Sequence, residues 1–166
     1  GFIAKFTSNG SLQYAERVLT NGKLFGAAWA STDEWSVFGS AKPNSSLFSQ
    51  NLTAIASAGD GFVARVDTSG TVQWVTMLPS SVSAVTLGSV VLDDGSCVIR
   101  GHFRGDLFLP SDTLIGSPSV TKSFVARLSS QGEILWAKRF SSIGPALLYD
   151  LDLDPNGDVL VYGRFE

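Results

Sequence analysis

The sequence Phe-Val-Ala-Arg-Val at residues 62–66 decides the fold, because closely similar sequences occur at two other places in the chain. Residues 124–128 read Phe-Val-Ala-Arg-Leu, and residues 2–6 read Phe-Ile-Ala-Lys-Phe. Each copy is followed by a polar stretch, a glycine and then an aromatic residue. The glycines are Gly10, Gly70 and Gly132, and the aromatic residues are Tyr14, Trp74 and Trp136. Self-similarity of this kind indicates a tandem repeat, which constrains the whole architecture.

The correspondence extends through the later part of the repeat. Residues 98–103 read Val-Ile-Arg-Gly-His-Phe and align with Leu-Val-Tyr-Gly-Arg-Phe at 160–165. The offset between the second and third copies stays at 62 residues throughout, whereas the first copy is two residues shorter between Tyr14 and Gly39. We therefore interpret residues 1–166 as a single repeat domain. Its repeats are residues 1–61, 62–123 and 124–166.

Each copy predicts four β-strands and very little helix. Residues 62–67 alternate apolar with small or basic side chains, which is typical of a half-buried strand. Glycine-containing turns at 68–70 and 93–95 predict two hairpins, and Asn156-Gly157 is a matching turn in the third copy. The four strands predicted for the second copy are residues 62–67, 71–78, 85–92 and 96–103. We expect each copy to form one antiparallel four-stranded meander, followed by a longer connection that begins at Gly105.

A four-stranded meander repeated in tandem is typical of the blades of a β-propeller. The predicted fold class is therefore all-β, with three blade-like meanders. Propellers close with typically four to eight blades, so three copies predict a partial ring or part of a larger propeller. The missing blades would come from the same polypeptide or from another chain. Two three-bladed chains would make a six-bladed ring.

The chain also resembles a known family, the bacterial β-propeller repeat often labelled SBBP. In the third copy, residues 124–127 (Phe-Val-Ala-Arg) match the opening of the family pattern, and Gly132 with Trp136 match its hairpin. Residues 154–158 and 161–163 resemble its third turn and its closing strand. The chain departs from the family pattern at Tyr14, which stands in place of Trp in the first copy, and the family's double glycine after the aromatic residue is missing. The resemblance implies a propeller, usually within large secreted or surface proteins, and no single reaction.

Composition narrows the function classes. The net charge of -3 provides no basic face for phosphate, so nucleic acid is not an expected partner. No apolar run approaches the ~18 residues that a membrane-spanning helix needs. One cysteine, Cys97, excludes an internal disulfide framework, and one histidine, His102, excludes a multi-histidine metal site. We expect His102 to face solvent or the edge of a sheet.

Residues 150–157 contain a calcium-loop-like spacing of oxygen ligands, with Asp152, Asp154 and Asn156 as candidate ligands. A strand with one buried face followed by a hairpin turn explains the same alternation of Asp and Leu. We favour the strand, and we expect no cofactor, with calcium as the alternative. The glutamate that closes an EF-type loop would fall at position 163, which is Gly163.

Three sequences have the form of N-glycosylation sites, at Asn9, Asn44 and Asn51. They would carry sugar if the protein is eukaryotic and secreted. The family resemblance and the composition together predict an extracellular or cell-surface location.

The leading hypothesis is a noncatalytic extracellular propeller with a structural, adhesive or assembly role. The alternative is a lectin-like propeller that binds carbohydrate or peptide, with Trp74, Trp136 and Trp35 as candidate ligand-binding residues. A weaker alternative is a carbohydrate-active enzyme that uses paired carboxylates among the turn acids Asp33, Glu34, Asp93 and Asp94. No catalytic set is evident. The cation repeated at Lys5, Arg65 and Arg127 is expected to be structural, over an aromatic ring or paired with an acid on the next blade.

Overall fold

The computed structural model describes residues 1–31, 33–140, 142–154 and 156–166, and these residues form β-strands and the turns between them. No helix occurs in the described ranges, and so none is long and apolar enough to cross a membrane. The expectation of an all-β chain is confirmed. The strands are β1 (Phe2–Phe6), β2 (Leu12–Arg17), β3 (Gly22–Ser31), β4 (Glu34–Ala41), β5 (Ser46–Leu47), β6 (Gln50–Asn51), β7 (Asp60–Asp67), β8 (Val72–Leu78), β9 (Ser83–Val91), β10 (Cys97–Arg104), β11 (Leu107–Leu109), β12 (Asp112–Leu114), β13 (Lys122–Leu128), β14 (Ile134–Phe140), β15 (Ala146–Leu153) and β16 (Val159–Phe165).

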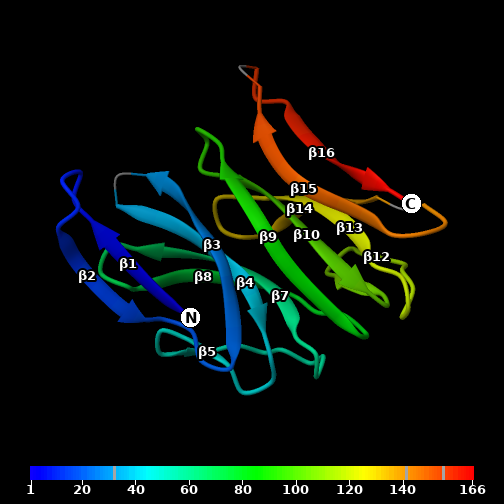
Figure 1. Cartoon of the computed structure of the whole chain (residues 1–166), viewed down its shortest axis with the longest axis horizontal. Coiled ribbons are helices and arrows are strands. Elements are labelled where there is room, and N and C mark those ends of the chain that lie inside the picture. Colours follow the sequence, from blue (N-terminus) through cyan, green and yellow to red (C-terminus); the bar gives the residue numbers. More distant parts are fainter. Residues whose placement is uncertain (32, 141, 155) are drawn as a thin grey trace.

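The longer strands form two four-stranded antiparallel sheets and two separate hairpins (Figure 1). Sheet I has the order β3-β4-β7-β8, and sheet II has the order β9-β10-β13-β14. The N-terminal hairpin is β1-β2 and the C-terminal hairpin is β15-β16. The two-stranded units β5-β6 and β11-β12 lie in the connections between the second and third strands of sheets I and II.

The prediction that each repeat forms its own sheet is wrong. Strands β7 and β8 of the second repeat complete a sheet begun by the first repeat, because β7 pairs with β4. Strands β9 and β10 of the same repeat begin sheet II, where β10 pairs with β13 of the third repeat. Each sheet is thus offset from the sequence repeat by half a repeat.

The four-residue link between β8 and β9 would suit a hairpin by its length alone, yet it carries the chain from one sheet to the next. Pro79, which has no backbone N–H, opens the link, and the buried carboxylate of Asp60 holds the next residue. Ser80 donates both its backbone N–H and its hydroxyl to Asp60 Oδ1, at 2.8 and 3.0 Å. These contacts fix the link against the start of β7 and turn β9 away from β8.

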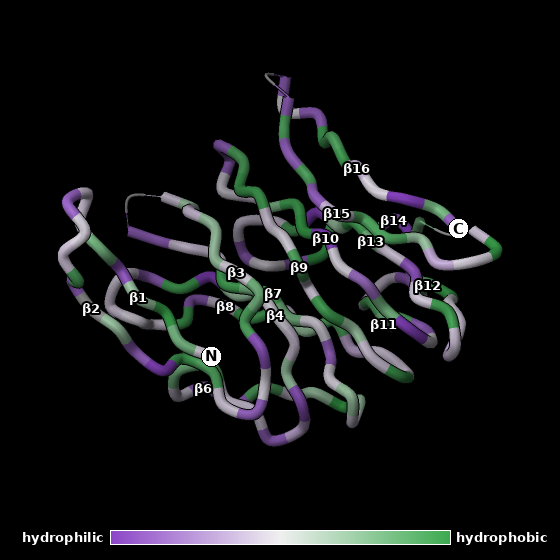
Figure 2. The backbone as a smooth tube through the Cα atoms, viewed as in Figure 1, coloured by the Kyte–Doolittle hydropathy of each residue, from purple (hydrophilic) through white to green (hydrophobic). Residues whose placement is uncertain are grey.

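Three apolar cores lie between successive layers of the stack. The core between the N-terminal hairpin and sheet I includes Phe62, and the core between sheets I and II includes Phe124. The third core, between sheet II and the C-terminal hairpin, centres on Val98, Val125 and Leu148. Figure 2 shows hydrophilic residues at the hairpin tips and apolar residues along the strands. Burial therefore occurs between sheets, as the two-sided apolar strands require.

Equivalent strands lie beside one another along the stack. Strand β9 contacts β3, β4 and β7 of sheet I and, on its other side, contacts β15. Strands β3, β9 and β15 begin equivalent halves of successive repeats and run in the same direction in Figure 1. Within the described ranges the stack does not close into a ring or barrel.

A glycine stands at the same place in the second strand of each layer, namely Gly39, Gly101 and Gly163. A Cβ at each position would overlap a backbone carbonyl oxygen of the preceding strand. At Gly101 the added atom would also strike the ring of Phe124, which lies opposite Gly101 on β13. Close approach of neighbouring backbones therefore explains why glycine occurs at this position in all three repeats.

Candidate functional site

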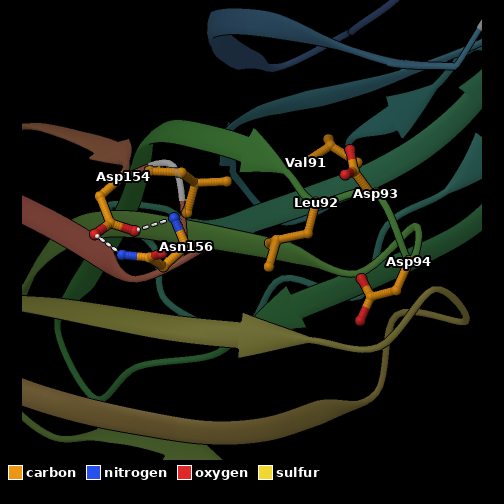
Figure 3. Close-up of a pocket in the computed structure, with 8 residues that line it drawn as sticks. Val91, Leu92, Asp93, Asp94, Asp154 and Asn156 are labelled. Atoms are coloured by element: carbon orange, nitrogen blue, oxygen red, sulfur yellow. Dashed lines mark hydrogen bonds between the residues drawn. The ribbon is translucent and has the colours of Figure 1, made fainter.

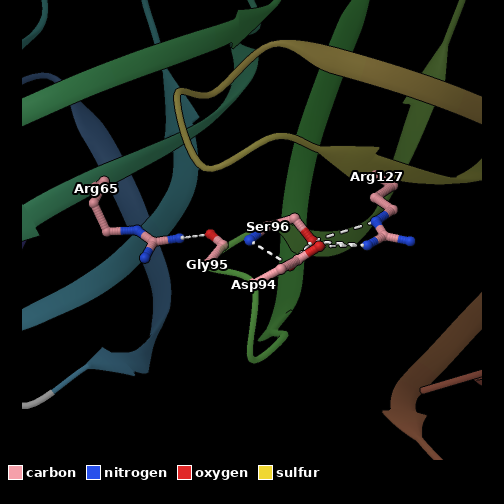
Figure 4. Close-up of polar contacts among 5 residues, drawn as sticks. All are labelled: Arg65, Asp94, Gly95, Ser96 and Arg127. Atoms are coloured by element: carbon pink, nitrogen blue, oxygen red, sulfur yellow. Dashed lines mark hydrogen bonds and ion pairs between the residues drawn. The ribbon is translucent and has the colours of Figure 1, made fainter. Parts of the chain in front are cut away.

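Two arginines at equivalent repeat positions approach one turn from opposite sides. The turn joins β9 to β10 and contains Asp94, Gly95 and Ser96. Figure 4 shows Arg65 of sheet I on one side of this turn and Arg127 of sheet II on the other. Two successive repeats thus hold the turn between them.

Arg65 connects sheet I with sheet II. Its Nη2 donates to the carbonyl oxygen of Gly95 at 3.0 Å, and its Nη1 lies 3.6 Å from a carboxylate oxygen of Glu34. The buried guanidinium also lies 5.5 Å from the ring centre of Trp74. The predicted placement of this cation over an aromatic residue is confirmed, but its acidic partner lies in the same sheet rather than in the next one.

Arg127 contacts the same turn from within sheet II. Its Nη2 lies 3.0 Å from Asp94 Oδ2 and donates to Ser96 Oγ at 3.0 Å. The hydroxyl and backbone N–H of Ser96, together with Arg127, lower the pKa of Asp94. A general acid needs a raised pKa, so the shift at Asp94 favours a structural carboxylate. Glu34, another of the acids proposed for catalysis, faces Arg65 in the same manner.

The tryptophans occupy three different environments. Trp74 is half-buried and donates its Nε1–H to the carbonyl oxygen of Ser130, in the β13–β14 turn of the next sheet, at 2.9 Å. Trp35 is buried and lies 6.3 Å from Trp29, measured between ring centres. Trp136 is the repeat equivalent of Trp74 but is 37% exposed. The difference arises because the layer that follows sheet II is the two-stranded hairpin β15-β16. In the described residues this hairpin has no counterpart of the β13–β14 turn that covers Trp74.

Asp60 and Lys122 also occupy equivalent positions, at the start of β7 and of β13. The Asp60 carboxylate accepts hydrogen bonds from Ile55 N, at 2.6 Å, and from Ala56 N and Ser80. Lys122 Nζ donates to the carbonyl oxygens of Ser142 and Gly144, at 2.6 and 2.9 Å. Both side chains hold the link that leads to the next layer. Sequence reasoning missed them, because opposite charges at one repeat position conceal the shared role.

A hollow of about 410 Å³ lies between the β9–β10 turn and the β15–β16 turn (Figure 3). Its polar lining includes Asp94, Asp154 and Asn156, the last two being candidate calcium ligands. Asp154 accepts hydrogen bonds from the backbone N–H groups of Asn156 and Asp158, at 2.8 and 2.9 Å, and from the Asn156 side-chain amide. These bonds lower the pKa of Asp154, with the backbone bond from Asp158 as the largest cause.

The third candidate ligand, Asp152, is exposed on β15, where its carboxylate accepts a hydrogen bond from Leu153 N at 2.8 Å. Pro155 of the calcium-like stretch lies outside the described residues. In the ranges that are described, no three His, Cys, Asp or Glu side chains gather as metal ligands. The predicted strand is present at 146–153 and the described part of the predicted turn at 156–157, while calcium binding stays untested.

The three candidate glycosylation residues are exposed. Asn9 lies in the β1–β2 turn, while Asn44 and Asn51 lie in the connection between β4 and β7. Asn44 has a positive φ of 62°, which asparagine tolerates in a turn. Their modification stays a prediction.

His102 differs from expectation. It is half-buried, and its Nε2 lies 3.2 Å from the carbonyl oxygen of Leu148 on β15. Burial lowers the pKa of His102, and the nearby Arg100 cation contributes to the same shift. His102 therefore belongs to the contact between sheet II and the C-terminal hairpin rather than to a free surface.

Comparison with known proteins adds no assignment: no protein-family model matches the chain, and the search of curated proteins gave no match. The likeness to the SBBP repeat stays a prediction from residues 2–6, 62–66 and 124–128 and the glycines that follow them.

Proposed function

We propose that this chain is a noncatalytic β-propeller module with a structural, adhesive or assembly role in a surface or secreted protein. The observation that carries the proposal is the contact between successive sheets made by repeated side chains. Trp74, a candidate ligand-binding residue, and Arg65, the repeated cation, both donate hydrogen bonds to backbone carbonyl oxygens of the next sheet.

The arrangement of the sheets supports a propeller. Four-stranded antiparallel meanders that stack face to face, with equivalent first strands adjacent, are the building principle of that architecture. Sheets I and II follow this pattern, and the two hairpins have the sequence and pairing of half-sheets in the same series. A noncatalytic role is supported by the turn carboxylates, since Glu34 and Asp94 are paired with arginines.

A lectin-like role is the second candidate, because two indole rings are accessible. Trp29 on β3 is 56% exposed and Trp136 on β14 is 37% exposed. Exposed aromatic rings supply large, rigid contact surfaces for ligands. The half-buried Trp74 fits the structural role better, since its N–H is already bonded within the protein.

Binding and stability measurements on the same variants separate the two candidates. A panel of mono- and oligosaccharides is titrated while tryptophan fluorescence is recorded for the wild type and for Trp136→Ala and Trp29→Ala. The structural proposal predicts no saturable change with any sugar and a lowered melting temperature for Trp74→Phe. A saturable fluorescence change that Trp136→Ala or Trp29→Ala abolishes would overturn the structural proposal in favour of carbohydrate binding.

A further inference from the structure

The two terminal hairpins expose apolar side chains whose repeat equivalents are buried. Phe2 on β1 is 74% exposed, whereas Phe62 and Phe124 at the same repeat position are fully buried. Leu160 on β16 is 67% exposed, whereas its equivalent Val98 is fully buried. Phe6 and Phe165 follow the same rule. The exposed apolar surface therefore belongs to the two terminal hairpins, which have two strands each where sheets I and II have four.

The free edges of the two hairpins match each other in sequence. In sheets I and II, the second strand of the sheet (β4 or β10) pairs with the third strand (β7 or β13). Strand β16 corresponds in sequence to β4 and β10, and β1 corresponds to β7 and β13. In the described chain β16 pairs only with β15, and β1 pairs only with β2. Each hairpin thus presents the edge that the other one needs.

We propose that β16 of one copy of this chain pairs with β1 of a second copy, so that β15-β16 and the partner's β1-β2 form a complete four-stranded sheet. The two hairpins lie at opposite ends of the stack, with sheets I and II between them, so β1 and β16 do not meet within one copy (Figure 1). This proposal rests on the proposed function of the chain as a noncatalytic β-propeller module, and it identifies a second copy of the chain as the partner. Every copy has one free β1 edge and one free β16 edge, so the association is head-to-tail.

The internal sheets fix the register of this pairing. Gly39 lies opposite Phe62, and Gly101 lies opposite Phe124. The equivalent pair places Gly163 opposite Phe2 of the partner copy, and the antiparallel register then sets Leu160 opposite its Lys5. A shift of one residue would turn every side chain to the wrong face of the sheet, so this register is the one that buries Phe2.

Charge complementarity supports the same register. Arg65 faces Glu34 across the β4–β7 pair, and the equivalent residues of β1 and of the turn before β16 are Lys5 and Asp158. The pairing thus brings Lys5 of one copy to Asp158 of the other, with the same sign of charge on each strand. In sheet II the corresponding residues, Arg127 and Ser96, are joined by a hydrogen bond of 3.0 Å.

The exposed indole of Trp136 gains a partner as well. Its equivalent, Trp74, donates to the carbonyl oxygen of Ser130 in the turn of the next layer. The β1–β2 turn carries Ser8 at the position of Ser130. In the assembled sheet, Trp136 would therefore donate to Ser8 of the partner copy.

Two charge reversals test the pairing. Lys5→Glu sets two acids against each other at every contact between identical copies, and Asp158→Lys sets two lysines together. Each variant alone should self-associate about tenfold more weakly or worse, because like charges oppose each other across an interface. An equimolar mixture restores opposite charges at both contacts between unlike copies. Sedimentation velocity over a concentration series, from micromolar to millimolar, measures all three samples and the wild type.

The proposal expects a wild-type assembly that each single variant weakens and that the mixture restores. Asp112→Lys is a control of the same charge change on an exposed residue of β12, which lies in the connection between β10 and β13, and it should associate like the wild type. A folded wild type that stays monomeric at millimolar concentration would overturn the head-to-tail pairing. It would not contradict the proposed function as a noncatalytic β-propeller module. Association that neither reversal weakens, or that the mixture does not restore, would also overturn the pairing. The sugar titration above decides the proposed function separately.

Discussion

The indole N–H of Trp74 reaches from the last strand of sheet I to the backbone of the next sheet, where it donates to the carbonyl oxygen of Ser130 at 2.9 Å. Thr76, two residues further along β8, donates its hydroxyl to the carbonyl oxygen of Gly132 in the same turn. These two bonds join the outer part of sheet I to sheet II, far from the β3–β9 contact. Sheets I and II are therefore joined near both edges of their shared contact.

Replacing Trp74 by Phe should lower the free energy of unfolding by about 1 kcal/mol, since one hydrogen bond between the sheets and part of a half-buried ring are lost. Trp136→Phe is the matched variant at the equivalent position, where no following turn is present. It should change the stability of the monomer by less than about 0.5 kcal/mol. Urea unfolding followed by circular dichroism measures both. Equal losses for the two variants would contradict the structural role assigned to Trp74.

The buried Asp60 should be among the residues on which stability depends most. Asp60→Ala leaves the backbone N–H groups of Ile55, Ala56 and Ser80 without their acceptor, which should cost about 3 kcal/mol or more. Asp60→Asn keeps one acceptor oxygen and should cost clearly less. Chemical denaturation distinguishes the two. A loss for Asp60→Ala below about 1 kcal/mol would show that the β8–β9 link does not depend on this carboxylate.

The repeated glycine gives a third expectation. Gly101→Ala sets a Cβ against the carbonyl oxygen of Val85 and the ring of Phe124, so it should destabilise by about 3 kcal/mol. Gly88→Ala, on the neighbouring strand β9, has side-chain atoms of Arg100 rather than a backbone carbonyl as its nearest neighbours and should cost less. Thermal unfolding of the two variants gives the comparison. An Ala at position 101 that is tolerated as well as one at position 88 would contradict the close β9–β10 approach.

Acid should weaken the hairpin turns. Hydrogen bonds from the Ser69 hydroxyl, and then from Thr71 N, lower the pKa of Asp67 below its ordinary value of 3.8. A carboxylate whose pKa is lower in the folded state stabilises the protein above pH 3.8, and that contribution is lost as the pH falls through the folded-state pKa. Urea midpoints measured from pH 6 down to about pH 2 should therefore fall less steeply for Asp67→Asn than for the wild type. Parallel curves would contradict this assignment.

The local strands were predictable, whereas their grouping into sheets was missed. The hairpins at 62–78 and 85–103 follow from alternation and from turns that contain Gly70 and Gly95, all of which are local signals. The pairing of β4 with β7 crosses a long connection that contains β5 and β6, and no local signal specifies it.

A clue to the correct grouping was nonetheless present in the strand at 62–66. It carries Phe62 on one face and Val63 on the other and is buried on both faces, as central strands are, whereas the following strand carries exposed polar residues such as Gln73. A first strand of a meander would be an edge strand, which β7 is not. For the candidate site, the sequence indicated Trp74 as a ligand candidate and Arg65 as a structural cation, but only the stacking of the sheets explains what they bind.

The central claim is that strands from successive repeats pair within one sheet. The stacking of the sheets and the free edges of β1 and β16 both depend on it. Nuclear Overhauser contacts between backbone protons test it most directly in the labelled protein. The structure predicts contacts across β10 and β13, between Gly101 and Phe124 and between Ile99 and Ala126. Cross-strand contacts between β8 and β9 in their place would show that each repeat folds into its own sheet, and would contradict the account.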